Sequence, residues 1–182
     1  MYLRTILSSP YLIHLILNSV SLPKLSTFPP TQLRKLSLTM MSSWETNQPL
    51  ISHLATSLEY LELTWCRFLP AAQVQLPPFP CLQELRYHQG YGESTFPDRS
   101  QLNALLRLAS QVTHLHVTGH TRNEPITACQ ESLRYLSIST PMLSEHIFGT
   151  RPFPQLVHLS LVLSVQRSTD SRALPSSTTI SQ

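Results

Sequence analysis

A leucine triplet with the spacing L-x-x-L-x-L recurs along the chain. It is clearest in SLEYLELTWCR, where Leu58, Leu61 and Leu63 form the triplet and Cys66 follows at the eighth step. The seven triplets are Leu12, Leu15, Leu17; Leu33, Leu36, Leu38; Leu58, Leu61, Leu63; Leu82, Leu85, Tyr87; Val112, Leu115, Val117; Leu133, Leu136, Ile138; and Leu156, Leu159, Leu161. Their first positions are 21, 25, 24, 30, 21 and 23 residues apart. Such regular spacing indicates that the chain is built from repeated structural units.

Each triplet predicts a short β-strand whose second and third apolar residues point into a coil, while the residues between them point outward. One coil cannot bury its apolar face alone, but stacked coils share a core and pair their strands in parallel. Units of about 20 to 29 residues are typical of leucine-rich repeats. We therefore predict an α/β fold over residues 1–163, a leucine-rich-repeat solenoid with a curved parallel sheet of about seven short strands and irregular or short-helical convex returns. An ordinary α/β domain with alternating strands is the alternative.

Two of the segments that return from one strand to the next carry helix signals. Residues 98–109 start with a capping-box spacing and continue with an apolar stripe of leucines. Residues 49–55 follow Asn47, a residue that favours helix starts, and again have one apolar face. The sequence therefore predicts a helix in each of these two returns.

Three phenylalanines, Phe28, Phe79 and Phe153, each precede a proline shortly before the next strand. Proline fixes φ and disfavours helix in the residue before it, so the chain is expected to reach the strand in an extended form. We expect these phenylalanines to fill the coil behind the sheet.

Composition narrows the class of protein and of partner. Only 13% of the residues are charged, and the thirteen Lys and Arg are scattered against ten acids, so the net charge of +3 does not indicate nucleic acid or a membrane as partner. The three cysteines form no C-x-x-C pair, which favours a reducing compartment. Ser8, Ser9 and Pro10 interrupt the N-terminal apolar run, so it predicts neither a signal peptide nor a membrane span. We predict a cytoplasmic or nuclear protein with a disordered, Ser/Thr-rich tail at 164–182.

The repeats resemble the repeat region of fungal proteins that carry an F-box. The resemblance rests on SSPYLIHLIL, FPPTQLRKLSL and PFPCLQEL and on the proline-rich returns between them, and it extends over residues 1–163. In that family the F-box docks on a ubiquitin-ligase core and the repeats present a surface for substrates. The resemblance thus implies the substrate-recognition region of a ubiquitin-ligase adaptor. Because the sequence starts inside a repeat, we expect the F-box, and with it the contact with the ligase core, to be missing from it.

The outward strand positions fall into columns, because equivalent residues of neighbouring strands lie about 4.8 Å apart. The columns of the middle strands are rich in Tyr, His, Glu and Arg, and such a mixed polar and aromatic surface suits a protein or peptide partner. We predict that the concave face binds a protein through Tyr60, Glu62, Glu84, Arg86, His88, His114, His116 and Tyr135. The alternative is that these strand faces are polar only because they are solvated.

Metal binding is the main rival chemistry. His114, His116 and His120 in THLHVTGH could ligate zinc or copper, with His88 adding a further nitrogen. No cysteine or carboxylate lies at ligand spacing, and the histidines fit the outward columns, so we predict no metal. We instead expect any interface here to respond to protonation near pH 6.5.

Catalysis has no sequence signature in this chain. Cys66 stands at a repeat position that normally turns inward and bonds the neighbouring backbone, so we expect it to be structural rather than nucleophilic. The chain has no G-x-S-x-G elbow, and its four glycines do not make a phosphate-binding loop. We predict no enzyme and no cofactor.

Both ends of the predicted solenoid are apolar, as YLIHLIL and LVHLSLVLSV show. Terminal repeats need polar caps, so we expect the chain to be part of a longer protein without its N-terminal cap, or to have its edges covered by another chain. Two functions remain open, a substrate-recognition module of a ubiquitin ligase and a non-catalytic interaction scaffold unconnected to ubiquitin.

Overall fold

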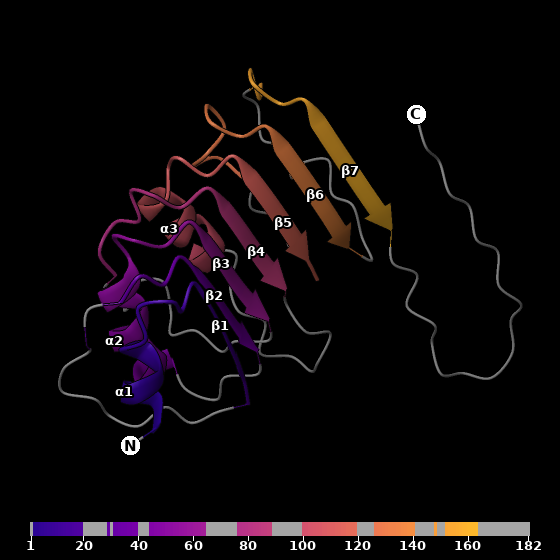
Figure 1. Ribbon diagram of the computed structural model, residues 1–182. Coiled ribbons are helices and arrows are strands. Elements are labelled where there is room, and N and C mark those ends of the chain that lie inside the picture. The colour runs from indigo at the N-terminus through magenta and orange to yellow at the C-terminus, as the bar shows by residue number, and fades with distance from the viewer. Residues whose placement is uncertain are drawn as a thin grey trace, which may run out of the picture.

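The computed structural model describes residues 2–19, 29, 31–39, 44–64, 76–88, 100–119, 126–140, 148 and 152–163. Its strands are β1 (His14–Asn18), β2 (Lys35–Thr39), β3 (Tyr60–Thr64), β4 (Glu84–His88), β5 (His114–Thr118), β6 (Tyr135–Thr140) and β7 (His158–Leu163). All seven lie in one sheet in chain order, and every neighbouring pair is parallel (Figure 1). This arrangement is a solenoid in which each coil contributes one strand, as predicted.

The register of the sheet follows the sequence repeat without a shift. Every strand starts at the first outward position of its triplet, so Tyr60 pairs with Glu84 and Glu84 pairs with His114. The inward leucines also lie side by side, as Leu36 and Leu61 show. The predicted columns are therefore confirmed as rows of adjacent side chains.

A shared main-chain contact joins each coil to the next. The carbonyl of Arg34, just before β2, accepts hydrogen bonds from the consecutive N–H groups of Glu59 and Tyr60, with N···O distances of 2.8 and 3.1 Å. We call such groups the forked carbonyls. They belong to Ile13, Arg34, Glu59, Gln83, Thr113 and Arg134. Each forked carbonyl lies immediately before a strand and fixes the start of the strand that follows in the sheet.

The core is a row of leucines behind the sheet. Both inward positions of each internal strand are buried, and Leu36, Leu85 and Leu136 are 0% exposed. The first residue of the triplet is buried as well in the five internal coils, since Leu33 and its equivalents up to Leu133 are at most 1% exposed. The sequence had assigned only the second and third residues to the interior, so the buried face of each coil is wider than the strand itself.

The phenylalanines behave unequally. Phe79 is 1% exposed and belongs to the core, as predicted. Phe153 is half-buried against it and meets Phe148 edge to face, with ring centroids 6.2 Å apart. Phe28 lies outside the described residues.

Both predicted helices are present, and the bounds of each differ from the prediction. Helix α3 (Ser100–Leu108) lies within the predicted 98–109 segment and buries its leucine stripe. Helix α2 (Trp44–Leu54) begins before the predicted 49–55 segment, so that Pro49 lies inside the helix rather than at its start. Proline removes one helix hydrogen bond and usually costs about 3 kcal/mol inside a helix. The apolar face of α2, including Leu50 and Ile51 at 0% exposed, anchors the helix in the core and offsets this cost.

Helix α1 (Tyr2–Leu7) was not predicted from the sequence. It lies at the β1 end of the solenoid (Figure 1), and its Leu7 is 1% exposed within the common core. The inward residues of β1, Leu15 and Leu17, are each 8% exposed. The core side of the first strand is therefore covered. Within the described ranges, no helix has the length and apolarity needed to cross a membrane.

Candidate functional site

The outward face of the sheet consists of the alternate strand side chains that point away from the core. On β3, β4 and β5 the strand residues alternate strictly between half-buried and buried, so the outward side chains stand beside one another with partial access to solvent. All eight predicted partner-binding residues lie on this outward face: Tyr60, Glu62, Glu84, Arg86, His88, His114, His116 and Tyr135.

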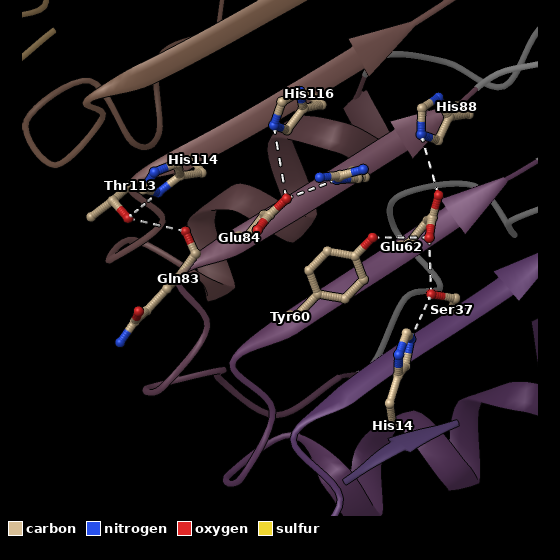
Figure 2. A network of polar contacts seen from close by, with 11 residues as sticks. His14, Ser37, Tyr60, Glu62, Gln83, Glu84, His88, Thr113, His114 and His116 are labelled. Carbon is tan, nitrogen blue, oxygen red and sulfur yellow. Dashed lines mark hydrogen bonds and ion pairs between the residues drawn. The ribbon is translucent and has the colours of Figure 1, made fainter. Parts of the chain in front are cut away.

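Glu62 is the centre of a polar network that spans several strands (Figure 2). Its Oε2 accepts 2.9 Å hydrogen bonds from the hydroxyl of Ser37 on β2 and from the phenol of Tyr60 on its own strand. Its Oε1 lies 3.6 Å from Nε2 of His88 on β4. Because the Ser37 hydroxyl donates to Glu62, the contact of 3.3 Å between His14 Nε2 and Ser37 Oγ has the histidine as donor.

Arg86 and Glu84 form the second half of the network. Arg86 Nε donates a 2.7 Å hydrogen bond to Glu84 Oε1, and the same carboxylate oxygen lies 3.8 Å from Nε2 of His116. The guanidinium of Arg86 also lies over the ring of Tyr60, with its carbon 5.5 Å from the ring centroid. This cation–π contact joins the contacts around Glu84 to those around Glu62. The connected side chains are Tyr60, Glu62, Glu84, Arg86, His88 and His116.

Aromatic rings continue the outward face towards β7. The rings of His114 and Tyr135 are stacked, with centroids 4.2 Å apart and planes at 11°. Tyr135 also meets His158, with centroids 5.9 Å apart. Thr113 donates to the carbonyl of Gln83, so the 2.9 Å contact between His114 Nδ1 and Thr113 Oγ1 has the histidine as donor. The stacked rings are thus fixed in position while Tyr135 remains 39% exposed.

The environment of this pair favours the carboxylate anion of Glu62 and the neutral phenol of Tyr60, which donates its proton in a hydrogen bond. Burial alone would raise the pKa of Glu62, but the hydrogen bonds from Ser37 and Tyr60 and the charges of His88 and Arg86 outweigh it, so the pKa lies below its usual value. Burial and the hydrogen bond to Glu62 raise the pKa of Tyr60 to about 12. The pair therefore keeps a charged acceptor and a neutral donor over a wide pH range.

The two histidines of the network favour their neutral forms. Burial lowers the pKa of His88, and the charge of Arg86 lowers it further, against the opposing effect of Glu62. Burial and Arg86 likewise lower the pKa of His116, against Glu84. The predicted protonation near pH 6.5 is therefore shifted to lower pH at these two positions, mainly because the rings are partly buried and further because the positive charge of Arg86 lies near them.

The eight predicted partner-binding residues do not include every member of the site. Ser37, His14, Thr113 and His158 all contact the predicted residues, His14 through an edge contact with the Tyr60 ring, and Ser37 is 4% exposed. The signal for Ser37 was available, since it precedes Glu62 in the same column and a hydroxyl next to a carboxylate favours a hydrogen bond.

The rival chemistries receive no further support from the geometry. Among the described residues, no group of three or more His, Cys, Asp or Glu side chains is arranged to hold a metal ion. His88 and His116 lie against carboxylates, while His114 stacks on Tyr135. His120 and Cys66 lie outside the described residues.

An open pocket of about 470 Å³ lies beside the strand starts, away from the predicted columns. Its lining residues are Thr31, Gln32, Arg34, Thr56, Ser57 and Cys81. These side chains include no histidine or carboxylate that could act as a base towards the thiol, so the pocket does not form a nucleophile–base pair.

Comparison of the chain with protein-family models, with curated proteins and with solved structures finds no match.

Proposed function

We propose that this chain is a protein-binding module of the leucine-rich-repeat class, and that the outward face of its sheet holds the partner. The seven triplets, their spacing and the buried leucine rows support the repeat class. The single observation that carries the binding role is the network that joins Tyr60, Glu62, Glu84 and Arg86 across two strands.

The network prepares its side chains for binding. Association costs the entropy of fixing mobile side chains, at about 0.5–1.5 kcal/mol for each rotamer-rich side chain, and a preorganised face has less of this cost left to meet. Arg86 is held at Nε by Glu84 and on one face by Tyr60, yet its side chain is 41% exposed. None of the described residues is bonded to its terminal Nη groups, so they are available as a two-pronged donor to a carbonyl or carboxylate of the partner.

Tyr135 supplies the second anchor. Its ring is fixed between His114 and His158 and remains 39% exposed, while the stacked contact restricts its rotamer. Tyr and Arg are the residue types that most often carry binding energy at protein interfaces. Arg86 and Tyr135 are therefore the two residues on which the proposal depends most.

The partner class is proposed from the resemblance of the repeats to those of F-box proteins. On that basis the module recognises a protein substrate for a ubiquitin ligase, and the ligase core is reached through an F-box. An interaction scaffold unconnected to ubiquitin uses the same outward face. The two candidate functions therefore differ only in whether the captured partner is accompanied by ubiquitin or its ligase.

Affinity capture from the native cell with matched variants tests the proposal. Arg86→Ala and Tyr135→Ala are each expected to lose the partner that the wild-type chain captures, while Arg107→Ala, an exposed position on α3, keeps it. Circular dichroism of each variant checks that the fold is intact. Equal capture by all variants would show that the outward face is not the binding surface. Ligase-core subunits among the captured proteins support the ubiquitin reading. Because the sequence is expected to lack the F-box, ubiquitin conjugates on the captured partner are the second readout, and a partner captured with neither supports the scaffold.

A further inference from the structure

The β7 end of the solenoid presents the same apolar surface that every internal coil buries. Leu159 and Leu161 are 45% and 40% exposed, whereas their partners in the register, Leu136 and Ile138, are 0% and 1% exposed. Val157, just before the strand, is 78% exposed. The coil that contains β7 thus has the apolar inward residues of the other coils, but among the described residues no neighbouring coil covers them on one side.

The main chain at this edge is also prepared for a further strand. Val157 occupies the position of a forked carbonyl, immediately before β7, but none of the described residues donates to its carbonyl. His158 N–H bonds the Arg134 carbonyl of the previous coil at 3.0 Å. Because a parallel strand directs alternate residues to its two neighbours, the N–H groups of Leu159 and Leu161 face the open edge.

Nothing in the chemistry of this edge opposes strand pairing. Residues 152–163, PFPQLVHLSLVL, contain no Asp, Glu, Lys or Arg. Edge strands of natural sheets are usually protected from pairing by charges, bulges or a covering segment, and β7 has no charge of this kind. An uncharged edge favours an uncharged, apolar partner strand.

We propose that β7 docks an extended segment of a partner polypeptide as an eighth parallel strand. The segment donates two consecutive N–H groups to the Val157 carbonyl and places alternate apolar side chains on Leu159 and Leu161, with no charge along its strand. The six forked carbonyls that join the seven coils specify this geometry, because the proposed contact continues the same interface by one step. It is a second interaction surface, separate from the outward face.

A second copy of this chain fits the edge less well. Two β7 strands related by a twofold axis would pair antiparallel, and this arrangement does not reproduce the forked-carbonyl contact. Head-to-tail addition would bring β1 onto β7, but Leu15 and Leu17 of β1 are already 8% exposed in a core that includes Leu7 of α1. The β1 end therefore lacks the free apolar surface that β7 needs.

A peptide taken from the chain itself provides the probe. Residues 131–140, ESLRYLSIST, contain the strand that β5 accepts in the solenoid, including its inward Leu136 and Ile138. The capped, fluorescently labelled peptide is expected to bind the full chain and to slow amide hydrogen exchange at Leu159 and Leu161, with His158 unchanged. A peptide carrying Leu136→Asp and Ile138→Asp is the control and is expected not to bind.

Protein variants locate the contact. Leu161→Lys on the inward face is expected to weaken peptide binding by about tenfold or more, because the apolar side chain that the incoming strand would bury is replaced by a charged one. Ser160→Lys, on the outward side of the same strand, is expected to change it by less than about twofold. Absence of binding, or binding without protection of Leu159 and Leu161, overturns the proposal. So does a wild-type dimer, seen by light scattering, that Leu161→Lys separates into monomers, since β7 would then be occupied by a second copy.

Discussion

The guanidinium carbon of Arg86 lies 5.5 Å from the centre of the Tyr60 ring, with the two residues on adjacent strands. A cation over an aromatic face is worth about 0.5–1 kcal/mol at an exposed site. Arg86→Met is therefore expected to destabilise a Tyr60→Phe chain by about that much more than a Tyr60→Leu chain. Urea unfolding of the two backgrounds measures the difference, and the phenylalanine background separates the ring contact from the Tyr60 hydrogen bond. Equal costs in both backgrounds would mean that the contact contributes no stability.

Alkaline pH is expected to destabilise the fold through Tyr60. Its pKa rises from the usual 10.0 to about 12 in the folded chain, because the phenol is partly buried and donates to Glu62. The unfolded chain therefore releases this proton first, and the associated stability, fully present below pH 10, is lost as the pH rises towards 12. The free energy of unfolding, measured at about pH 9 and about pH 11, should fall less in Tyr60→Phe than in the wild type. A fall of the same size in both would contradict the assignment.

Acid is expected to destabilise the fold through His88 and His116. The pKa of each lies below the usual 6.5 in the folded chain, because burial and Arg86 disfavour the charged ring. Their stabilising effect is therefore present above pH 6.5 and is lost as the pH falls through the folded values, since the unfolded chain binds the protons first.

Chemical denaturation at about pH 7.5 and about pH 5.5 measures this loss of stability. The free energy of unfolding is expected to fall less between these two pH values in His116→Gln than in the wild type. In the wild type, burial and the repulsion from Arg86, His114 and His88 disfavour the charged His116 ring more than the attraction of Glu84 favours it. His53→Gln, at an exposed position on α2, is the matched control. A wild-type response in His116→Gln would show that this ring does not drive the acid effect.

The burial gradient along the core predicts unequal costs for the same substitution. Leu136 and Leu159 are partners in the register, but the first is 0% and the second 45% exposed. Leu136→Ala is expected to lower the free energy of unfolding by about 2–5 kcal/mol, since it leaves a cavity. Leu159→Ala is expected to cost less than about 1.5 kcal/mol. Denaturant unfolding of the two variants checks this directly, and similar costs would contradict the open end at β7.

The cysteines are expected to differ in reactivity. Burial raises the pKa of the Cys129 thiol to about 12, and the side chain is 1% exposed, so little thiolate is present or accessible. Cys81 is exposed. In a Cys66→Ser background, a thiol reagent should therefore label the chain rapidly at Cys81 and slowly at Cys129. Cys81→Ser should remove the rapid phase and Cys129→Ser should preserve it; the reverse pattern would contradict the burial of Cys129.

The strands could be predicted because their signal is local and repeated. Alternation of inward and outward residues, repeated in every triplet, determines both the strand and its register, so positions such as Tyr60 and Glu84 were placed side by side from the sequence. Helix α1 has no such signal, since YLRTIL is too short for a periodic pattern and has no acidic residue in its first turn. The predicted helix starts at Pro49, after Asn47, whereas α2 already begins at Trp44, because burial of the α2 face outweighs the cost of an internal proline.

The columns gave the membership of the candidate site but not its contacts. Side-chain hydrogen bonds across strands depend on rotamers and on partial burial, and neither can be derived from a list of outward residues. The sequence therefore placed His88 and His116 on the correct face, but it gave no reason to expect pKa values different from the usual 6.5. Their shifts arise from burial beside Arg86, which becomes visible only once β4 and β5 are paired.

The forked carbonyls make the position of each strand in the sheet independent of the length of the return that precedes it. Successive strand starts are 21 residues apart from His14 to Lys35 and 30 apart from Glu84 to His114, yet both pairs of strands are aligned in the same way. A return can therefore gain or lose residues without rotating the outward side chains. Because the forked-carbonyl contact consists only of main-chain atoms, outward residues can also be exchanged without disturbing it. The register of the sheet and the residues of its outward face can thus change independently of each other.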